Sequence, residues 1–217
     1  MNDHPHYEYH SAEPSWGNQY LWPPLAKLLS AHLPHQARVF ELGCGNGAIA
    51  GKIAALGFEV TAIDTSESGI SQAASGNPGV TFAIGSAYDD LAGNYGTFDA
   101  VVSLEVVEHL FSPRTFAHSV SQLLNPGGVA LISTPYHGYL KNLFLALTGK
   151  LEAHWDPLWD GGHIKFWSKD SLTRLLTEQN LTVESIYPVG RVPPLAKSMI
   201  AVAKRGSADR SISPQQR

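Results

Sequence analysis

The run from Val39 to Gly47, Val-Phe-Glu-Leu-Gly-Cys-Gly-Asn-Gly, is the feature that most constrains the fold of this chain. Two apolar residues lead into an acid, and glycines then stand at every second position, 43, 45 and 47. Glycine permits both a sharp turn and a close approach of the backbone to a ligand. Residues 48–56 are helix-forming and Gly57 is a natural stop, so the run predicts a strand, a glycine loop and a helix. Such a unit is typical of a cradle for a nucleotide-type ligand.

The glycine loop can be interpreted in two ways. Gly43, Gly45 and Ala48 satisfy the G-x-G-x-x-G/A pattern of dinucleotide-binding folds, which is a weak signal when it stands alone. With Glu41 and Gly47, the loop instead forms an E-x-G-x-G-x-G string that resembles the first motif of class I S-adenosylmethionine (SAM)-dependent methyltransferases. A dinucleotide needs helix amides aimed at a pyrophosphate. SAM has no phosphate, and its cationic amino-acid end favours a nearby carboxylate such as that of Glu41.

A second acid, Asp64, ends the predicted strand 58–63 and lies 23 residues after Glu41. An acid at this position can accept hydrogen bonds from both ribose hydroxyls, a geometry that the two families share. Asp64 therefore indicates a ribose without choosing between NAD and SAM. The length favours SAM, because 217 residues fit one domain and leave little for a separate substrate domain.

Composition and charge narrow the class of protein further. Hydrophobic residues make up 43% and charged residues 16%, enough apolar material for one core of doubly wound size. The net charge of −4 supplies no basic field, which disfavours nucleic acid as a partner. The single Cys44 excludes an intramolecular disulfide and is more simply a small side chain in a tight turn than a reactive thiol. No apolar run is long enough for a membrane span and the first residues lack a signal pattern, so we expect a cytoplasmic protein.

The rest of the chain alternates helices and strands as a parallel α/β fold does. With the two strands above it predicts seven strands, the methyltransferase count, in a Rossmann-like, mostly parallel sheet with helices on both faces and a C-terminal antiparallel hairpin. The predicted helices lie near 25–32, 67–75, 114–124, 140–147 and 169–179, and the further strands at 79–84, 98–104, 129–133, 182–187 and 198–203. The domains expected are a lid and helix segment 1–36, a methyltransferase domain 37–204 with an acceptor-binding insert 136–165, and a disordered tail 205–217.

The resemblance also implies which residues contact SAM. After the predicted third strand the family has an acid that meets the adenine amino group, where this chain has Ser86, whose hydroxyl accepts more weakly. The fourth strand, ending at Leu104, places its tip beside the sulfonium. Aromatic residues before the first strand stand where relatives often carry a lid, although plain packing explains them as well. The implied SAM-binding residues are Glu41, Gly43, Cys44, Gly45, Gly47, Asp64, Thr65, Ser86, Ala87, Leu104, Tyr9 and Trp16.

The string Glu105-Val106-Val107-Glu108-His109 follows the fourth strand. On a helical turn, positions 105, 108 and 109 are spaced i, i+3 and i+4 and share one face. This E-x-x-E-H string resembles ubiquinone-pathway O-methyltransferases and small-RNA 3′-end 2′-O-methyltransferases, where it holds a divalent cation together with a later histidine. His163 falls where that histidine is expected, so the resemblance implies a set of Glu105, Glu108, His109 and His163 for Mg²⁺, Mn²⁺ or Zn²⁺.

A metal-free interpretation of the same string stays open. The acid would then interact with the helix dipole, His109 would serve as a base or a supporting residue, and His163 would pack against the next helix.

The sequence therefore predicts a SAM-dependent methyltransferase, monomeric or homodimeric, that methylates a small molecule, favouring a hydroxyl oxygen. The catalytic residues would be His109, Glu105 and His163. Trp155 and Trp159 in the insert indicate a flat or apolar acceptor. The alternatives are an enzyme that cleaves another carbon–sulfur bond of SAM, and a SAM-binding domain without catalysis.

Overall fold

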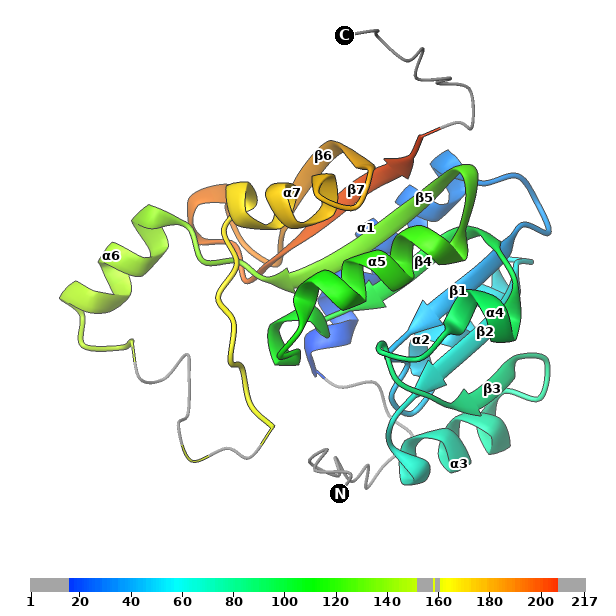
Figure 1. Ribbon diagram of the computed structural model, residues 1–217. Helices are drawn as coiled ribbons and strands as arrows, with labels where there is room; N and C mark the ends of the chain where they lie inside the picture. The colour runs from blue at the N-terminus through cyan, green and yellow to red at the C-terminus, as the bar shows by residue number, and fades with distance from the viewer. Residues whose placement is uncertain (1–15, 152–157, 159–160, 207–217) are drawn as a thin grey trace, which may run out of the picture.

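Seven strands form one twisted sheet in the order β3-β2-β1-β4-β5-β7-β6 (Figure 1). The computed structural model describes residues 16–151, 158 and 161–206. The strands from β1 to β5 pair in parallel, and β7 pairs antiparallel with both β5 and β6. The predicted fold class is confirmed, including the C-terminal hairpin. The strands are β1 Arg38–Leu42, β2 Glu59–Asp64, β3 Thr81–Ile84, β4 Phe98–Leu104, β5 Leu124–Pro135, β6 Leu181–Val189 and β7 Ser198–Arg205.

Helices cover both faces of the sheet (Figure 1). Because successive strand residues point to opposite faces, Val39 and Phe40 on β1 enter two different apolar clusters. Strand order reverses between β1 and β4, and a crevice outside the carboxyl ends of the strands is expected at such a point. The helices are α1 Trp16–His32, α2 Ala48–Ala55, α3 Glu67–Gly76, α4 Leu91–Tyr95, α5 Pro113–Leu123, α6 Tyr139–Leu147 and α7 Lys169–Thr177, with 3-10 turns η1 Val107–His109 and η3 Pro193–Leu195.

Helix α1 begins well before the predicted start near residue 25. It runs through Pro23 and Pro24, which lack the amide donors of a helix interior. Leu21, Leu25 and Leu29 are all fully buried and lie one above another at a spacing of four. Packing of this stripe against the sheet outweighs the two missing hydrogen bonds, so the predicted start was wrong.

Two further elements differ from the prediction. Strand β5 already begins at Leu124, so the glycine pair at 127–128 lies inside the strand and not before it, beside a register shift in its pairing with β4. Helix α4, which was not predicted, has only five residues, too few for a recognisable apolar period. Its cap is Asp90, whose carboxylate accepts a hydrogen bond from the Gly93 amide at 3.1 Å. Most of the predicted tail lies outside the described residues, but its first residue, Arg205, ends β7.

Candidate functional site

The glycine loop after β1 has the backbone conformation that the sequence predicted. Gly43, Gly45 and Gly47 have φ values of 83°, 55° and 75°, in the left-handed region that favours glycine. A Cβ on Gly43 would lie 2.4 Å from Cγ2 of Val106, and one on Gly47 would lie 2.5 Å from Cβ of Ala73. The glycines are therefore needed for close packing against the turn after β4 and against α3, as well as for the turn itself.

Two acidic side chains lie beside the glycine loop. Asp64, at the end of β2, accepts hydrogen bonds from the amides of Gly45 at 2.8 Å and Ser66 at 2.9 Å. Glu41 is 2% exposed, and its Oε2 has no hydrogen-bond partner among the described residues. Burial raises the pKa of both carboxyl groups, and the charge of Asp64 raises that of Glu41 further. A ligand that brings hydroxyl or ammonium donors to this loop would relieve both groups.

Other predicted cofactor residues lie along the same edge of the sheet. Thr65 follows β2, Ser86 follows β3 and Leu104 ends β4, each at the carboxyl end of a parallel strand. Cys44 is buried within the loop, and burial raises the pKa of its thiol, with Glu41 adding to the shift. Burial and a raised pKa both favour the packed-side-chain interpretation over a reactive thiol. Tyr9 and the side chain of Trp16 lie outside the described residues.

The loop after β3 carries a carboxylate that the sequence reasoning missed. Asp89 accepts a hydrogen bond from the Ser86 amide through Oδ2 at 2.7 Å, and the Ser86 hydroxyl accepts one from the Tyr88 amide at 3.2 Å. Ala87 is buried, and its carbonyl accepts a hydrogen bond from Ser119 Oγ at 2.9 Å. The family's acid is expected at position 86, where this chain has a serine, and the Asp89 carboxylate lies next to that position. The Ser-x-x-Asp spacing was the available signal.

The turn after β4 differs from the helical turn predicted across residues 105–109. The 3-10 turn η1 covers only Val107–His109, and Glu105 precedes it with φ +55°. Because Glu105 is outside the helical turn, the i, i+3, i+4 spacing does not apply to it and that prediction was wrong. Its carboxyl oxygens instead accept hydrogen bonds from Ser133 Oγ at 2.6 Å and Ser198 Oγ at 3.0 Å.

Glu105 is the centre of a small hydrogen-bond network. Ser198 gives its only hydroxyl proton to Glu105, so Tyr20, whose hydroxyl oxygen is 2.6 Å from Ser198 Oγ, donates to the serine. Burial raises the pKa of Glu105 to about 7. Burial and the charge of Glu105 raise the pKa of Tyr20 to about 12. The network joins α1, the turn after β4, β5 and β7, and it fixes the Glu105 side chain.

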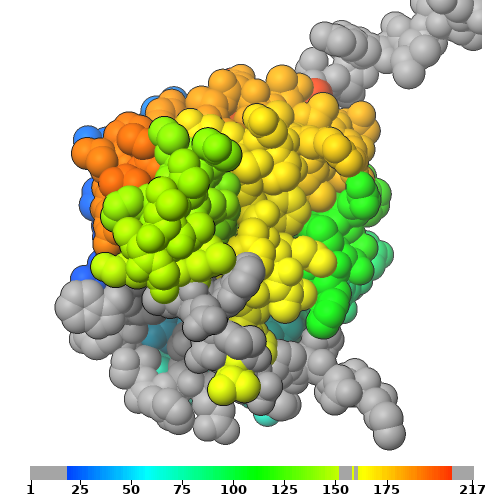
Figure 2. Space-filling view, turned by 90° about the vertical axis from the view of Figure 1, so that its left-hand side faces the viewer, coloured from blue at the N-terminus to red at the C-terminus, as the bar shows by residue number. Residues whose placement is uncertain are grey.

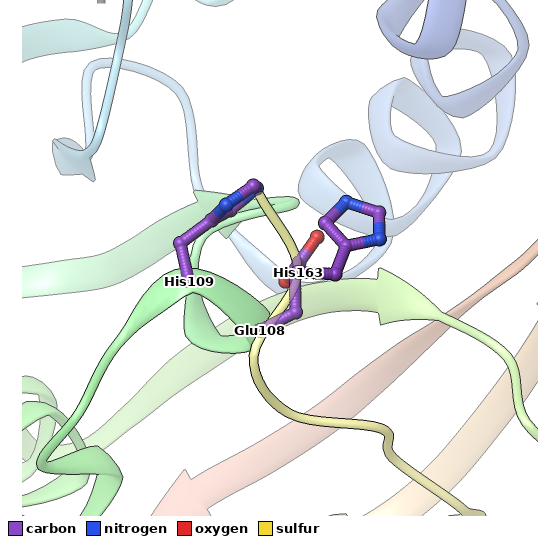
Figure 3. A group of neighbouring side chains, drawn as sticks. All are labelled: Glu108, His109 and His163. Atoms are coloured by element: carbon purple, nitrogen blue, oxygen red, sulfur yellow. The ribbon is translucent and has the colours of Figure 1, made fainter. Parts of the chain in front are cut away.

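Glu108, His109 and His163 come together at this edge, with one possible ligand atom of each within 4.8 Å of the others. Figure 3 shows the two imidazole rings on either side of the Glu108 carboxyl group. The segment that carries His163 is held by the Glu108 carbonyl, which accepts hydrogen bonds from the amides of Ile164 and Lys165, both at 3.0 Å. The structure thus unites three of the four predicted ligands from segments 54 residues apart in the sequence.

The surroundings of each imidazole indicate its protonation. Nδ1 of His109 lies 2.7 Å from the Gly161 carbonyl oxygen, so Nδ1 carries a proton and donates it to this carbonyl. Burial, followed by the charges of His109 and His137, lowers the pKa of His163 to about 4, which keeps this ring neutral. Neutral imidazoles are the form that binds metals.

The donor set fits a divalent cation. Glu108 is 1% exposed, and neither of its carboxyl oxygens has a well-aligned donor among the described residues. Burial and the neighbouring Glu105 both raise its pKa well above the usual range. One carboxyl and two imidazoles suit Mn²⁺ or Zn²⁺, and Mg²⁺ would need further oxygen ligands. Glu105 is not among these three residues, and its two carboxyl oxygens accept hydrogen bonds from Ser133 and Ser198.

A cavity of about 320 Å³ adjoins the three residues and shares His163 with them. Sequence reasoning did not identify its basic side chains, because Lys141 and Lys197 are 56 residues apart and share no motif. A second depression, of about 450 Å³, lies along the outer face of α7 and includes none of the predicted site residues. The 320 Å³ cavity is lined by Pro135, His137, Lys141, His163, Arg191, Leu195, Ala196 and Lys197.

The predicted insert 136–165 contributes α6 to this edge. Its exposed apolar side chains include Tyr139, Leu140 and Phe144, at 80%, 59% and 52% exposure. Trp155 and Trp159 lie outside the described residues. None of the described helices is long and apolar enough to cross a membrane.

Comparisons with known proteins give a consistent result. A family profile described as "Methyltransferase domain" matches residues 16–186. The ubiquinone biosynthesis O-methyltransferase of Caulobacter sp. (strain K31) is 34% identical over 161 residues, which are 72% of this chain and 64% of that protein. The mitochondrial ubiquinone biosynthesis O-methyltransferase of Schizosaccharomyces pombe is 29% identical over 181 residues, 81% of this chain and 65% of the relative. The chain therefore spans less than two thirds of the length of these relatives.

A solved structure has the same fold. Magnesium protoporphyrin IX methyltransferase from Synechocystis, with S-adenosylhomocysteine (SAH) bound, superposes with a TM-score of 0.67 over 88% of this chain and 84% of that one. The two sequences are 18% identical, so this likeness concerns the fold alone.

Proposed function

Because this chain belongs to the methyltransferase domain family, whose cofactor is SAM, we propose that it transfers the SAM methyl group to a hydroxyl oxygen of a small molecule. The predicted resemblance to this family is confirmed by the match over residues 16–186. The choice of oxygen is supported by the curated relatives, which are named O-methyltransferases. The observation that carries the proposal is the Glu108–His109–His163 group beside the glycine loop.

The glycine loop and the acids beside it would bind SAM. Asp64 already uses one lone pair of each oxygen for a backbone amide, and a carboxylate has enough acceptor sites to receive the ribose hydroxyls as well. The unpartnered oxygen of Glu41 suits the cationic amino-acid end. Asp89, next to Ser86, would take the place of the acid that accepts from the adenine amino group.

Glu108, His109 and His163 would hold a divalent cation, which when bound supplies a Lewis acid that lowers the pKa of an acceptor hydroxyl. The residues themselves position the site. Hydrogen bonds from His109 Nδ1 to backbone carbonyls fix the ring, and the two serine hydroxyls fix the nearby Glu105 side chain. Catalysis by these groups would consist mainly of orienting the hydroxyl towards the methyl group.

The acceptor would be flat or apolar, as predicted from the aromatic residues of the insert. The exposed apolar side chains of α6 support this, since they lie on the segment that follows β5 at the same edge. In the metal-free alternative, Nε2 of His109 takes the hydroxyl proton, because Nδ1 is occupied by a carbonyl.

Product analysis by mass spectrometry tests the proposal. The protein is incubated with SAM, Mn²⁺ and a set of catechols, and both products are measured. We expect SAH together with an acceptor that is 14 mass units heavier, the mass of a methyl group replacing a proton. Methylthioadenosine would show that another carbon–sulfur bond is cleaved, and SAM binding with neither product would contradict an enzymatic function.

A further inference from the structure

The 320 Å³ cavity contains three cationic side chains, those of Lys141, Arg191 and Lys197. Among the described residues, none of the three forms an ion pair, whereas other basic side chains do, such as Arg114 with Glu178 and Lys204 with Glu184. Unpaired cations that converge on one concave site favour a negatively charged ligand. The cavity therefore has the charge of an anion site.

Lys141 is fixed in this cavity by the backbone. It lies in the first turn of α6 and is 7% exposed, and its Nζ donates to the carbonyl oxygens of Tyr136 at 2.8 Å and Lys197 at 3.4 Å. An ammonium group has three protons, so one donor remains for a ligand. Burial and then the repulsive charge of Arg191 lower the pKa of Lys141, while the attractive charge of Glu105 acts in the opposite direction. A bound anion would offset both the repulsion between the two cations and the cost of burying the Lys141 ammonium group away from water.

The other two cations come from the loop between β6 and β7. Lys197 lies with Nζ 5.1 Å from the centre of the Tyr20 ring, a cation–π contact that restricts its direction. Arg191 belongs to the segment that precedes η3, and α6 contacts η3. Figure 2 shows α6 in lime green beside the orange segment that includes this loop, with the yellow segment before α7 on its other side.

The cavity lies on the acceptor side of the site. The glycine loop follows β1, whereas the cavity lies where β5 ends and β7 begins, and β4 with its turn stands between them in the sheet. His163 belongs both to the cavity and to the candidate metal group, so a ligand in the cavity reaches that group directly. Pro135 and Leu195 give it apolar walls.

We propose that this cavity binds an anionic group of the acceptor, so that the substrate is a hydroxylated carboxylate or phosphate ester whose hydroxyl lies at the Glu108–His109–His163 group. The part of this inference that makes the anionic ligand the methyl acceptor rests on the proposed function. Lys141, Arg191 and Lys197 act by charge-assisted hydrogen bonds, which position the substrate and take no part in the chemistry.

Calorimetric binding tests the inference without requiring turnover. 3,4-Dihydroxybenzoate, its uncharged methyl ester and inorganic phosphate are titrated separately into the SAH-loaded protein. We expect the benzoate to bind at least about tenfold more tightly than the ester, as one or two charge-assisted hydrogen bonds imply. Phosphate that binds more tightly than the benzoate would assign the site to a phosphate ester.

Matched variants separate the cavity from its surroundings. The double variant R191Q/K197Q changes two exposed side chains, so it keeps the fold, and K204Q on β7 is the control. The preference for the benzoate over the ester should fall to about twofold or less in the double variant and persist in the control.

Three results would overturn the inference. The first is equal binding of the benzoate and the ester by the wild-type protein. The second is an unchanged preference for the benzoate in R191Q/K197Q. The third is a weaker affinity of that variant for SAH, because this result would assign the cations to the carboxylate of the cofactor. Failure of the proposed function is a separate result, because a protein that forms no SAH from SAM would still show charge-dependent binding of the benzoate.

Discussion

The glycine loop and the Glu108–His109–His163 group lie at the same edge of the sheet but are assembled differently. The loop is formed by residues 43–47 and contacts acids at the ends of β1 and β2. The Glu108–His109–His163 group combines a turn after β4 with a segment that follows α6. Asp64 beside the loop accepts hydrogen bonds from two backbone amides, whereas neither carboxyl oxygen of Glu108 has a well-aligned donor among the described residues. The cofactor side is thus organised by its own backbone, whereas the proposed acceptor side combines side chains from distant segments.

The two regions meet where Gly43 packs against Val106, and the substitution G43A should have the largest effect. The positive φ and a Cβ 2.4 Å from Val106 Cγ2 should together lower the free energy of unfolding by about 3 kcal/mol, measured by urea denaturation. The control G149A, with positive φ and open space, should cost only about 1 kcal/mol. Equal losses in both variants would show that the contact between the regions is unimportant.

The double variant G43A/V106A sharpens this result. Removing the Val106 methyl groups makes room for the new Cβ, so the double variant should be more stable than the sum of the two single effects by at least about 0.5 kcal/mol. Strict additivity would mean that only the backbone conformation of Gly43 matters.

Asp64 tests whether the cofactor side works independently. The substitution D64A should weaken SAH binding about 100-fold in calorimetry, because two charge-assisted hydrogen bonds to the ribose are lost. Mn²⁺ binding should stay unchanged, and D170A on the exposed start of α7 should affect neither ligand. Unchanged SAH affinity in D64A would contradict the ribose assignment.

Glu105 tests the electrostatics of the acceptor side. Its pKa is raised to about 7 in the folded protein from 4.5, so between these pH values the folded state holds a proton that the unfolded state has lost. Glu105 therefore stabilises the metal-free protein least above pH 7, and the stability difference between wild type and E105Q should change by about 2 kcal/mol from pH 5 to pH 7. Thermal unfolding measured across this range, with E67Q as an exposed control, would contradict the account if the difference were constant.

Cys44 should show the smallest effect. Because its thiol is buried and its pKa is raised, the native protein should not react with a thiol reagent such as dithionitrobenzoate at pH 8, whereas the urea-unfolded protein should react fully. Rapid reaction of the native protein would mean that the glycine loop opens.

The comparison also explains what the sequence could predict. The alternating strands and the glycines with positive φ depend on local spacing, so the fold class and the loop followed from residues close together in the chain. The orientation of the Glu105 side chain could not be predicted from the local sequence. Its left-handed backbone and its hydrogen bonds from Ser133 and Ser198 depend on strands β5 and β7. The cationic cavity was missed for the same reason, since its members share no motif.

Titration of Mn²⁺ into the SAH-saturated protein tests the central claim most directly. The account predicts one site in the wild type and in H118A, an exposed histidine on α5, and no site in H163A, while SAH affinity stays within about twofold in all three. Loss of the site in H163A alone would establish Glu108, His109 and His163 as a metal centre separate from the cofactor site. Absence of Mn²⁺ binding in the wild type, or equal binding in H163A, would contradict it.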